Sequence, residues 1–259
     1  MRASSARVWL ASYPRSGSTL LRLLLWHGFA LPSTSIYLRD LGGNAALERE
    51  VGHFELGAAV PDGSAAGPLL VKTHGPPPDS GAAIYVVRDG RDASVSLWHF
   101  KGRRDSLRAV IGGVLWAGTW AAHVRAWDPL ARPDTLLLRY EEMACDPSRA
   151  LESIGTFLGR PVRSTRLPDR AALAALDGRW VRAVPSDWSG EASGRDRRLF
   201  DAVNGRAMAA LGYARGVGAR PPLRALGTCG ELAYWRMVRR LRRGGGTGLA
   251  GAGGGRADA

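Results

Sequence analysis

Residues 8–25, VWLASYPRSGSTLLRLLL, constrain the fold of this chain more than any other segment. The pattern predicts a buried strand at residues 8–11, a polar turn at 12–19 and a helix that begins near Thr19. In such a unit the backbone N–H groups of the turn converge, and the positive end of the helix dipole faces the same point. An anion is stabilised there, so the segment predicts a phosphate-binding turn.

The turn also supplies side chains for an anion. Arg15 adds a permanent cation, and Ser16, Ser18 and Thr19 add hydroxyl donors. The turn differs from the GxxxxGK[ST] loop of nucleotide triphosphatases, because no glycine opens it and no lysine precedes a serine or threonine. This difference disfavours ATP and favours another phosphate-bearing donor.

The length of 259 residues suits one α/β domain with appendages. No run of about 18 apolar residues occurs, and the first strand starts too early to leave room for a secretory leader. Cys145 and Cys229 are too few for a disulfide framework and do not have metal-ligand spacing. We therefore expect a cytoplasmic protein.

The net charge of +13 indicates anionic partners in general. Much of the excess lies after Arg215 and in scattered arginines, and Lys72 and Lys101 are the only lysines. We interpret the arginine excess as a compositional bias and expect no nucleic-acid partner. The scarcity of lysine makes Lys72 stand out.

Three more strands are predicted at residues 69–72, 83–87 and 135–139, as apolar runs typical of strands buried on both faces. Helical patterns lie between and after them, at about residues 45–51, 93–100, 118–127 and 147–158. Strands that alternate with helices indicate a parallel, doubly wound sheet flanked by helices, a three-layer α/β fold.

His74, Arg88 and Tyr140 each follow the end of one predicted strand. Ligands of doubly wound sheets bind beyond the carboxyl ends of the strands. We therefore expect these side chains and the phosphate-binding turn to surround one crevice.

Four segments, in this order, resemble the sulfotransferases that use 3′-phosphoadenosine 5′-phosphosulfate (PAPS). They are YPRSGSTLLR, KTH at 72–74, YVVRDGRDASVSLWHF at 85–100, and GTWAAHVRAW followed by LLLRYEEM and CDPSRALESIGTFLG. The resemblance covers about residues 8–212. It implies a fold like that of P-loop nucleoside triphosphatases, with a sulfotransferase domain at 1–214 and a tail at 215–259.

The resemblance also implies roles for particular residues. The 5′-phosphosulfate would contact the turn, the 3′-phosphate would contact a strand end and the next helix, and adenine would lie near an aromatic ring. The residues of the turn are Arg15, Ser16, Gly17, Ser18 and Thr19. Arg88 and Ser96 are the residues for the 3′-phosphate, and Tyr140 is the aromatic residue near adenine. His74 matches the catalytic histidine of the family.

Three positions depart from the family pattern. Arg15 stands where the family usually has lysine, and Leu20 stands where an aromatic ring often stacks on adenine. The late Arg-Lys-Gly motif is replaced by Trp-Val-Arg-Ala at 180–183, which leaves Arg182 as the candidate for the remaining contact with the 3′-phosphate.

Sulfuryl transfer resembles phosphoryl transfer, with a loose in-line transition state whose charge lies on peripheral and leaving oxygens. Positioned cations stabilise such charge, and we expect Arg15 and Lys72 to supply them. His74, with an ordinary pKa of about 6.5, would take the proton from an acceptor hydroxyl. No metal is expected, because no metal-ligating cluster stands out.

Structural roles compete with functional ones at several positions. Tyr140 fits core packing as well as an adenine contact, and Trp116, Trp120 and Trp127 have a spacing typical of core residues. Arg91 and Asp92 are interpreted as a surface ion pair. The remaining histidines are expected in the core or on the surface.

The tail contains a basic amphipathic pattern at residues 231–243, followed by a glycine-rich end that we expect to be disordered. The basic segment suits contact with a membrane surface or with a carrier of the acceptor. A helix packed on the domain explains the same pattern.

Three functions remain open on this reasoning. The favoured one is a sulfotransferase acting on a hydroxyl of a small molecule, glycoside or lipid-linked acceptor. A small-molecule kinase would need the missing GxxxxGK[ST] loop, and a non-catalytic module for anions or nucleic acid would need a stripe of arginine and aromatic residues. The loops at 31–67, 101–114 and beyond 163 reveal neither the acceptor nor the oligomeric state.

Overall fold

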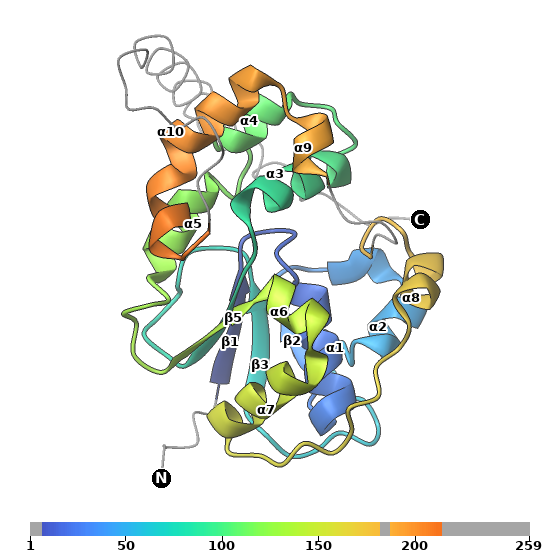
Figure 1. The fold of residues 1–259 in the computed structure, drawn as a ribbon. Helices are drawn as coiled ribbons and strands as arrows, with labels where there is room; N and C mark the ends of the chain where they lie inside the picture. The colour runs from blue at the N-terminus through green and yellow to red at the C-terminus, as the bar shows by residue number, and fades with distance from the viewer. Residues whose placement is uncertain (1–6, 182–186, 214–259) are drawn as a thin grey trace, which may run out of the picture.

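A computed structural model describes residues 7–181 and 187–213. Its centre is a five-stranded parallel sheet in the order β2-β3-β1-β4-β5 (Figure 1). The strands are β1 (Arg7–Ser12), β2 (Ser33–Ser35), β3 (Leu69–Thr73), β4 (Ala83–Val87) and β5 (Thr135–Arg139). The predicted strands and the parallel topology are confirmed. The short polar strand β2 was not predicted, because three residues without an apolar run leave no strand signal.

Helices occupy about half of the remaining described chain. They are α1 (Ser18–Phe29), α2 (Ala45–Glu50), α3 (Gly90–Phe100), α4 (Leu107–Ile111), α5 (Trp120–Trp127), α6 (Tyr140–Cys145), α7 (Pro147–Leu158), α8 (Arg170–Leu176), α9 (Trp188–Glu191) and α10 (Gly194–Ala210), with a 3-10 turn, η1, at Asp40–Gly43. None of the helices in the described ranges is both long and apolar enough to cross a bilayer.

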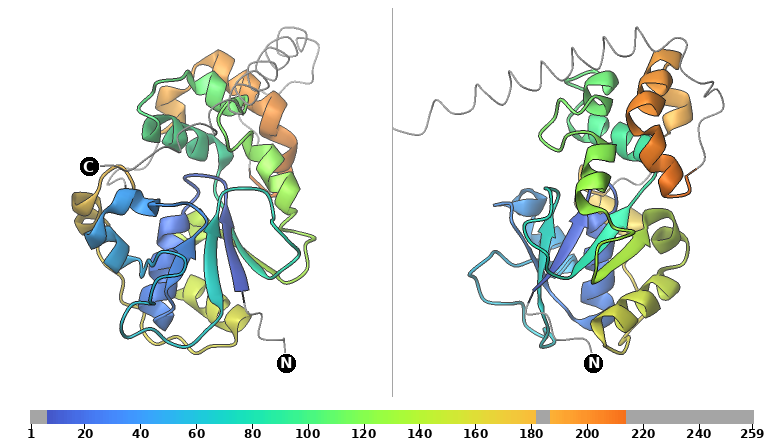
Figure 2. Two further views of the ribbon diagram at one scale, coloured as in Figure 1. Left: turned by 180° about the vertical axis from the view of Figure 1, so that it is seen from behind. Right: turned by 90° about the vertical axis from the view of Figure 1, so that its left-hand side faces the viewer.

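Alternate residues of β1, β3, β4 and β5 enter two separate cores. Trp9, Val71 and Tyr85 pack on one face of the sheet with α3, α4, α5 and α10. Leu10 and Ile84 pack on the other face with α1 and α7. Both faces are apolar, so the strands read as continuous apolar runs. The two groups of helices lie on different sides of the strands (Figure 2), which confirms the three-layer fold.

Some details differ from the sequence-based predictions. Helix α6 was not predicted, and α3 begins at Gly90 rather than near residue 93, because the Asp89 carboxylate accepts from the Arg91 backbone N–H and caps the helix. The predicted pair of Arg91 with Asp92 is wrong: the Arg91 side chain donates to Asp89 instead, at 2.9 Å from Nε to Oδ1. The basic segment at 231–243 lies outside the described residues, and the domain boundary stays a prediction.

Candidate active site

The predicted phosphate-binding turn connects β1 to α1 as expected. Arg15 and Gly17 both have positive φ, 68° and 109°, and the Ser16 N–H donates to the Tyr13 carbonyl at 3.1 Å. Gly17 is the N-cap of α1 but supplies no side-chain cap. The first amides of a helix have no acceptor within it, so those at the start of α1 are available to an anion.

Gly17 is required for two reasons. Side chains are strained at its φ of 109°, and a Cβ placed there would lie 2.6 Å from Cδ2 of Tyr140. The Tyr140 ring, at the start of α6, therefore packs directly on the turn. The Arg88 guanidinium lies 4.6 Å from the centre of the same ring. Tyr140 thus supports both the turn and Arg88.

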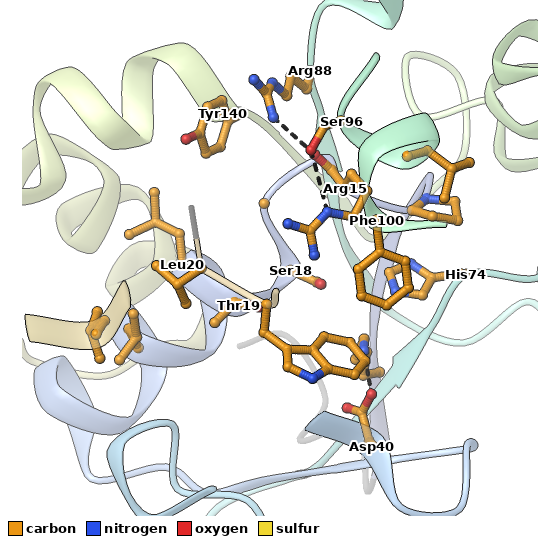
Figure 3. Close-up of a pocket in the computed structure, with 18 of the residues that line it drawn as sticks. Arg15, Ser18, Thr19, Leu20, Asp40, His74, Arg88, Ser96, Phe100 and Tyr140 are labelled. Atoms are coloured by element: carbon orange, nitrogen blue, oxygen red, sulfur yellow. Dashed lines mark hydrogen bonds and ion pairs between the residues drawn. The ribbon is translucent and has the colours of Figure 1, made fainter. Parts of the chain in front are cut away.

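Three residues predicted to bind the donor are hydrogen-bonded to one another. The Arg88 Nη1 donates to the Arg15 carbonyl at 3.1 Å, and the Arg15 Nε donates to the Ser96 hydroxyl at 3.3 Å (Figure 3). The Arg15 guanidinium also lies 4.9 Å from the Phe100 ring centre. The turn, the end of β4 and helix α3 therefore meet at one place. Arg15, predicted to contact the 5′-phosphosulfate, is a neighbour of Ser96, predicted to contact the 3′-phosphate.

His74 follows β3, and its ring is oriented by β1. Its Nδ1 lies 2.8 Å from the Ser12 carbonyl oxygen, which only accepts hydrogen bonds. Nδ1 therefore carries the hydrogen, and Nε2 has the lone pair of a base. Burial, and then the charge of Lys72, hold the pKa of His74 well below 6.5, so the predicted ordinary pKa is wrong. The imidazole is neutral at neutral pH.

Lys72, which was predicted to supply a cation to the transferred group, is held in a buried ion pair. Its Nζ lies 2.7 Å from Oδ1 of Asp40, and both side chains are buried. Burial lowers the pKa of Lys72 to about 8, although the Asp40 charge opposes that shift. Most Lys72 side chains remain protonated at neutral pH.

Most of the predicted site residues line one pocket of about 420 Å³, a size typical of small-molecule sites. They are Arg15, Gly17, Ser18, Thr19, Lys72, His74, Arg88, Ser96 and Tyr140. Leu20 lines it as well. Ser16 does not line the pocket, because its side chain is fully buried. Arg182 lies outside the described residues.

Sequence reasoning missed several residues of the pocket. Asp40 and Tyr37 come from the irregular segment after α1, and Trp180 follows α8. Trp116, predicted as core, is 52% exposed and lines the pocket, whereas Trp120 and Trp127 are buried. One signal for a buried acidic residue was available in the sequence. Helix α1 is rich in leucine and contains Arg22, and a buried arginine needs a partner of opposite charge.

The described ranges contain no group of three or more His, Cys, Asp or Glu residues arranged to hold a metal ion. A metal-independent reaction stays a prediction.

Two comparisons relate the sequence to known proteins. Residues 5–177 match the family described as Sulfotransferase domain. The chain is 33% identical over 121 residues to Sulfotransferase 2A1 of Rattus norvegicus, covering 39% of this chain and 42% of that protein. It is 29% identical over 178 residues to Sulfotransferase 2B1 of Homo sapiens, covering 60% of this chain and 47% of that protein. These matches span less than half of either relative.

The fold agrees with this relationship. The structure is similar to that of mouse sulfotransferase SULT7A1 complexed with PAP, with a TM-score of 0.53, 20% sequence identity and coverage of 88% of each chain. At that identity the likeness shows the fold, and the match to the family over residues 5–177 covers well over half of the chain. This chain belongs to the sulfotransferase family.

Proposed function

We propose that the chain transfers the sulfuryl group of PAPS to a hydroxyl of a small-molecule acceptor. The observation that carries the proposal is the meeting of two unlike functions in one pocket. An anion-binding turn at a helix N-terminus and a histidine with its lone pair on Nε2 both line it. Family membership supports a phosphosulfate as that anion.

The donor would occupy two neighbouring anion sites. The amides at the start of α1 and the Arg15 side chain suit the 5′-phosphosulfate, and Arg88 with Ser96 suits the 3′-phosphate. The hydrogen bond between Arg15 and Ser96, at 3.3 Å, supports the proposal that the two sites are adjacent. This supports a nucleotide that carries phosphates at both positions.

In the reaction, the acceptor oxygen forms a bond to sulfur while the bond from sulfur to the bridging oxygen of the donor breaks. His74 Nε2 takes the acceptor proton, which the neutral imidazole can do at neutral pH. The leaving group is PAP, whose 5′-phosphate keeps the electron pair. Arg15 and Lys72 stabilise the charge on the leaving and peripheral oxygens.

The acceptor side of the pocket is aromatic. The Tyr37 ring is stacked against His74, with centroids 5.9 Å apart and an interplanar angle of 22°. The Trp116 ring lies 6.2 Å from His74 and 5.7 Å from Tyr37. Such walls favour an acceptor with a planar or apolar face next to its hydroxyl. The cytoplasmic location and the role of the tail stay predictions.

The test is transfer from PAPS labelled in its sulfuryl group to a panel of acceptors, read by mass spectrometry. A phenol, a long-chain alcohol and a simple glycoside represent the three kinds of hydroxyl, and ATP replaces PAPS in a parallel series. We expect sulfated products with the phenol or the alcohol, and no phosphorylated product from ATP. Phosphate transfer from ATP, or a protein that neither binds PAP nor forms a sulfated product, would contradict the proposal.

A further inference from the structure

Three buried side chains form an ion cluster behind the pocket, which we call the charge triad: Arg22, Asp40 and Lys72. Oδ2 of Asp40 lies 2.8 Å from Nη1 of Arg22, and Oδ1 lies 2.7 Å from Nζ of Lys72. The three residues are 1%, 4% and 3% exposed. They come from α1, η1 and β3, so one carboxylate joins three elements.

The members of the triad differ in their access to the pocket. Asp40 and Lys72 line it, and Arg22 does not. The Arg22 guanidinium is fixed by a second hydrogen bond, because its Nε donates to the Ser33 hydroxyl at 2.8 Å. One oxygen of Asp40 therefore faces a fixed guanidinium, and the other faces the ammonium group of Lys72.

The backbone around Asp40 is unusual. Arg39 and Leu41, on either side of it, both have positive φ, 51° and 63°. L-residues rarely adopt this conformation, and its cost must be offset by surrounding contacts. Leu41 is buried in a small core with Leu23 and Leu47, which supplies such contacts. The turn therefore holds Asp40 at a definite position.

We propose that Asp40, fixed by Arg22, is a positioning residue that directs the Lys72 ammonium into the pocket and keeps it protonated during turnover. This proposal rests on the function proposed above, in which Lys72 stabilises charge on the transferred group.

The charges around Lys72 explain why it needs Asp40. Two positive charges act on Lys72, that of Arg22 on α1 and that of Arg15 in the turn. His74, two residues after Lys72, is neutral. Burial and the two arginines lower the pKa of Lys72, and Asp40 is the described acidic side chain that contacts its Nζ and opposes the shift. The rings of Tyr37 and Trp180 lie 5.9 and 5.8 Å from Nζ. Without the Asp40 charge, Lys72 would lose its proton at lower pH.

The experiment uses the two lysines of the chain as reporters. Lysine labelled with ¹³C and ¹⁵N yields two side-chain signals, Lys72 and the exposed Lys101, in the full-length protein. The Lys72→Arg variant assigns them. We expect the Lys72 signal to titrate near pH 8, and in the Asp40→Asn variant at a pH lower by about 1–3 units, the usual effect of one nearby opposite charge.

A kinetic measurement adds the functional part. A protonated Lys72 is the active form, so kcat should fall as pH rises past about 8. In Asp40→Asn this alkaline limb should move down by the same 1–3 units. In Lys72→Arg it should disappear, because guanidinium does not titrate in this range. Asp40→Glu restores a carboxylate and should return the limb toward its original position, even where kcat stays lower.

Matched controls separate this role from a merely structural one. Asp62→Asn makes the same chemical change at an exposed carboxylate and should leave both titrations unchanged. If Asp40→Asn does not fold, Asp40→Glu and the wild-type Lys72 titration still test the proposal: a wild-type Lys72 signal that titrates below pH 7 would overturn it, because the ammonium would then not be protonated during turnover. An unshifted Lys72 titration in folded Asp40→Asn would overturn it too. Shifted titrations in a protein without sulfotransferase activity would instead contradict the proposed function.

Discussion

The hydrogen bond from Nδ1 of His74 to the Ser12 carbonyl leaves Nε2 as the only atom of this ring that can accept a proton. At the same time, burial and the neighbouring Lys72 charge favour the neutral ring. The fold therefore supplies a base in one tautomer, ready at neutral pH. Neither property can be inferred from the tripeptide KTH.

We expect His74→Ala to lower kcat by about 10²–10⁴-fold, the usual range for loss of a general base. PAP affinity, measured by calorimetry, should stay near the wild-type value, because the residues proposed to hold the donor are Arg15, Arg88 and Ser96. A variant that binds PAP normally and keeps near wild-type turnover would show that the base lies elsewhere.

The pH profile provides a second measurement on the same residue. In the proposed reaction the deprotonated ring is the active form, so kcat should rise with pH through the pKa of His74, which lies well below 6.5. The acid limb should therefore be complete before neutral pH and should be absent in His74→Ala. An acid limb centred at or above pH 6.5 would contradict the environment described for this ring.

Arg88 and Arg91 make a matched pair, three residues apart. Arg88 is 8% exposed, lines the pocket and donates to the Arg15 carbonyl, whereas Arg91 is paired with Asp89 outside the pocket lining. A charge-assisted hydrogen bond contributes about 1.5–3 kcal/mol, so Arg88→Ala should weaken PAP binding by about 10- to 150-fold. Arg91→Ala should change it by less than about twofold. Equal losses by calorimetry would mean that the 3′-phosphate site is misplaced.

At the scale of elements, the junction of β1 and α1 depends on Gly17. Gly17→Ala places a methyl group against the Tyr140 ring and requires a strained φ. We expect a loss of stability of about 1–3 kcal/mol in denaturant unfolding, together with weaker PAP binding, because the amides of the turn must shift.

Gly63 provides the control for this substitution. It also has positive φ, 78°, but has open space around the Cβ position. Gly63→Ala should carry the backbone strain without any change in PAP affinity. Replacing Tyr140 with alanine in the Gly17→Ala background should recover part of the lost stability, and no recovery would show that the ring contact is unimportant.

For the whole molecule, binding of the donor product PAP should raise the melting temperature, Tm. A second phosphate site should make PAP bind more than tenfold tighter than adenosine 5′-phosphate, a difference of about 1.4 kcal/mol. At equal concentrations well above both Kd values, PAP should then raise Tm by about 3–6 °C more than adenosine 5′-phosphate does. Arg88→Ala should remove most of this difference and His74→Ala should retain it. Identical Tm shifts in the wild type would contradict two phosphate sites.

The sequence by itself determined the long strands, the polar turn between β1 and α1, and the meeting of Arg15, His74, Arg88 and Tyr140 at one edge. This was possible because apolar runs and a glycine-serine turn are encoded in contiguous residues, and the carboxyl ends of parallel strands meet at the same edge. The family followed from motifs of the same local kind.

Only the tertiary structure decided which charged groups meet in the site and which side chains line the pocket. Asp40 and Lys72 are 32 positions apart, and their contact depends on a turn whose backbone conformation is set by packing. Trp116 follows the spacing of its buried neighbours yet opens into the pocket, since helical periodicity does not extend to a residue that precedes α5. The pKa directions of His74 and Lys72 depend on burial and on charges from other elements, which no short stretch of sequence contains.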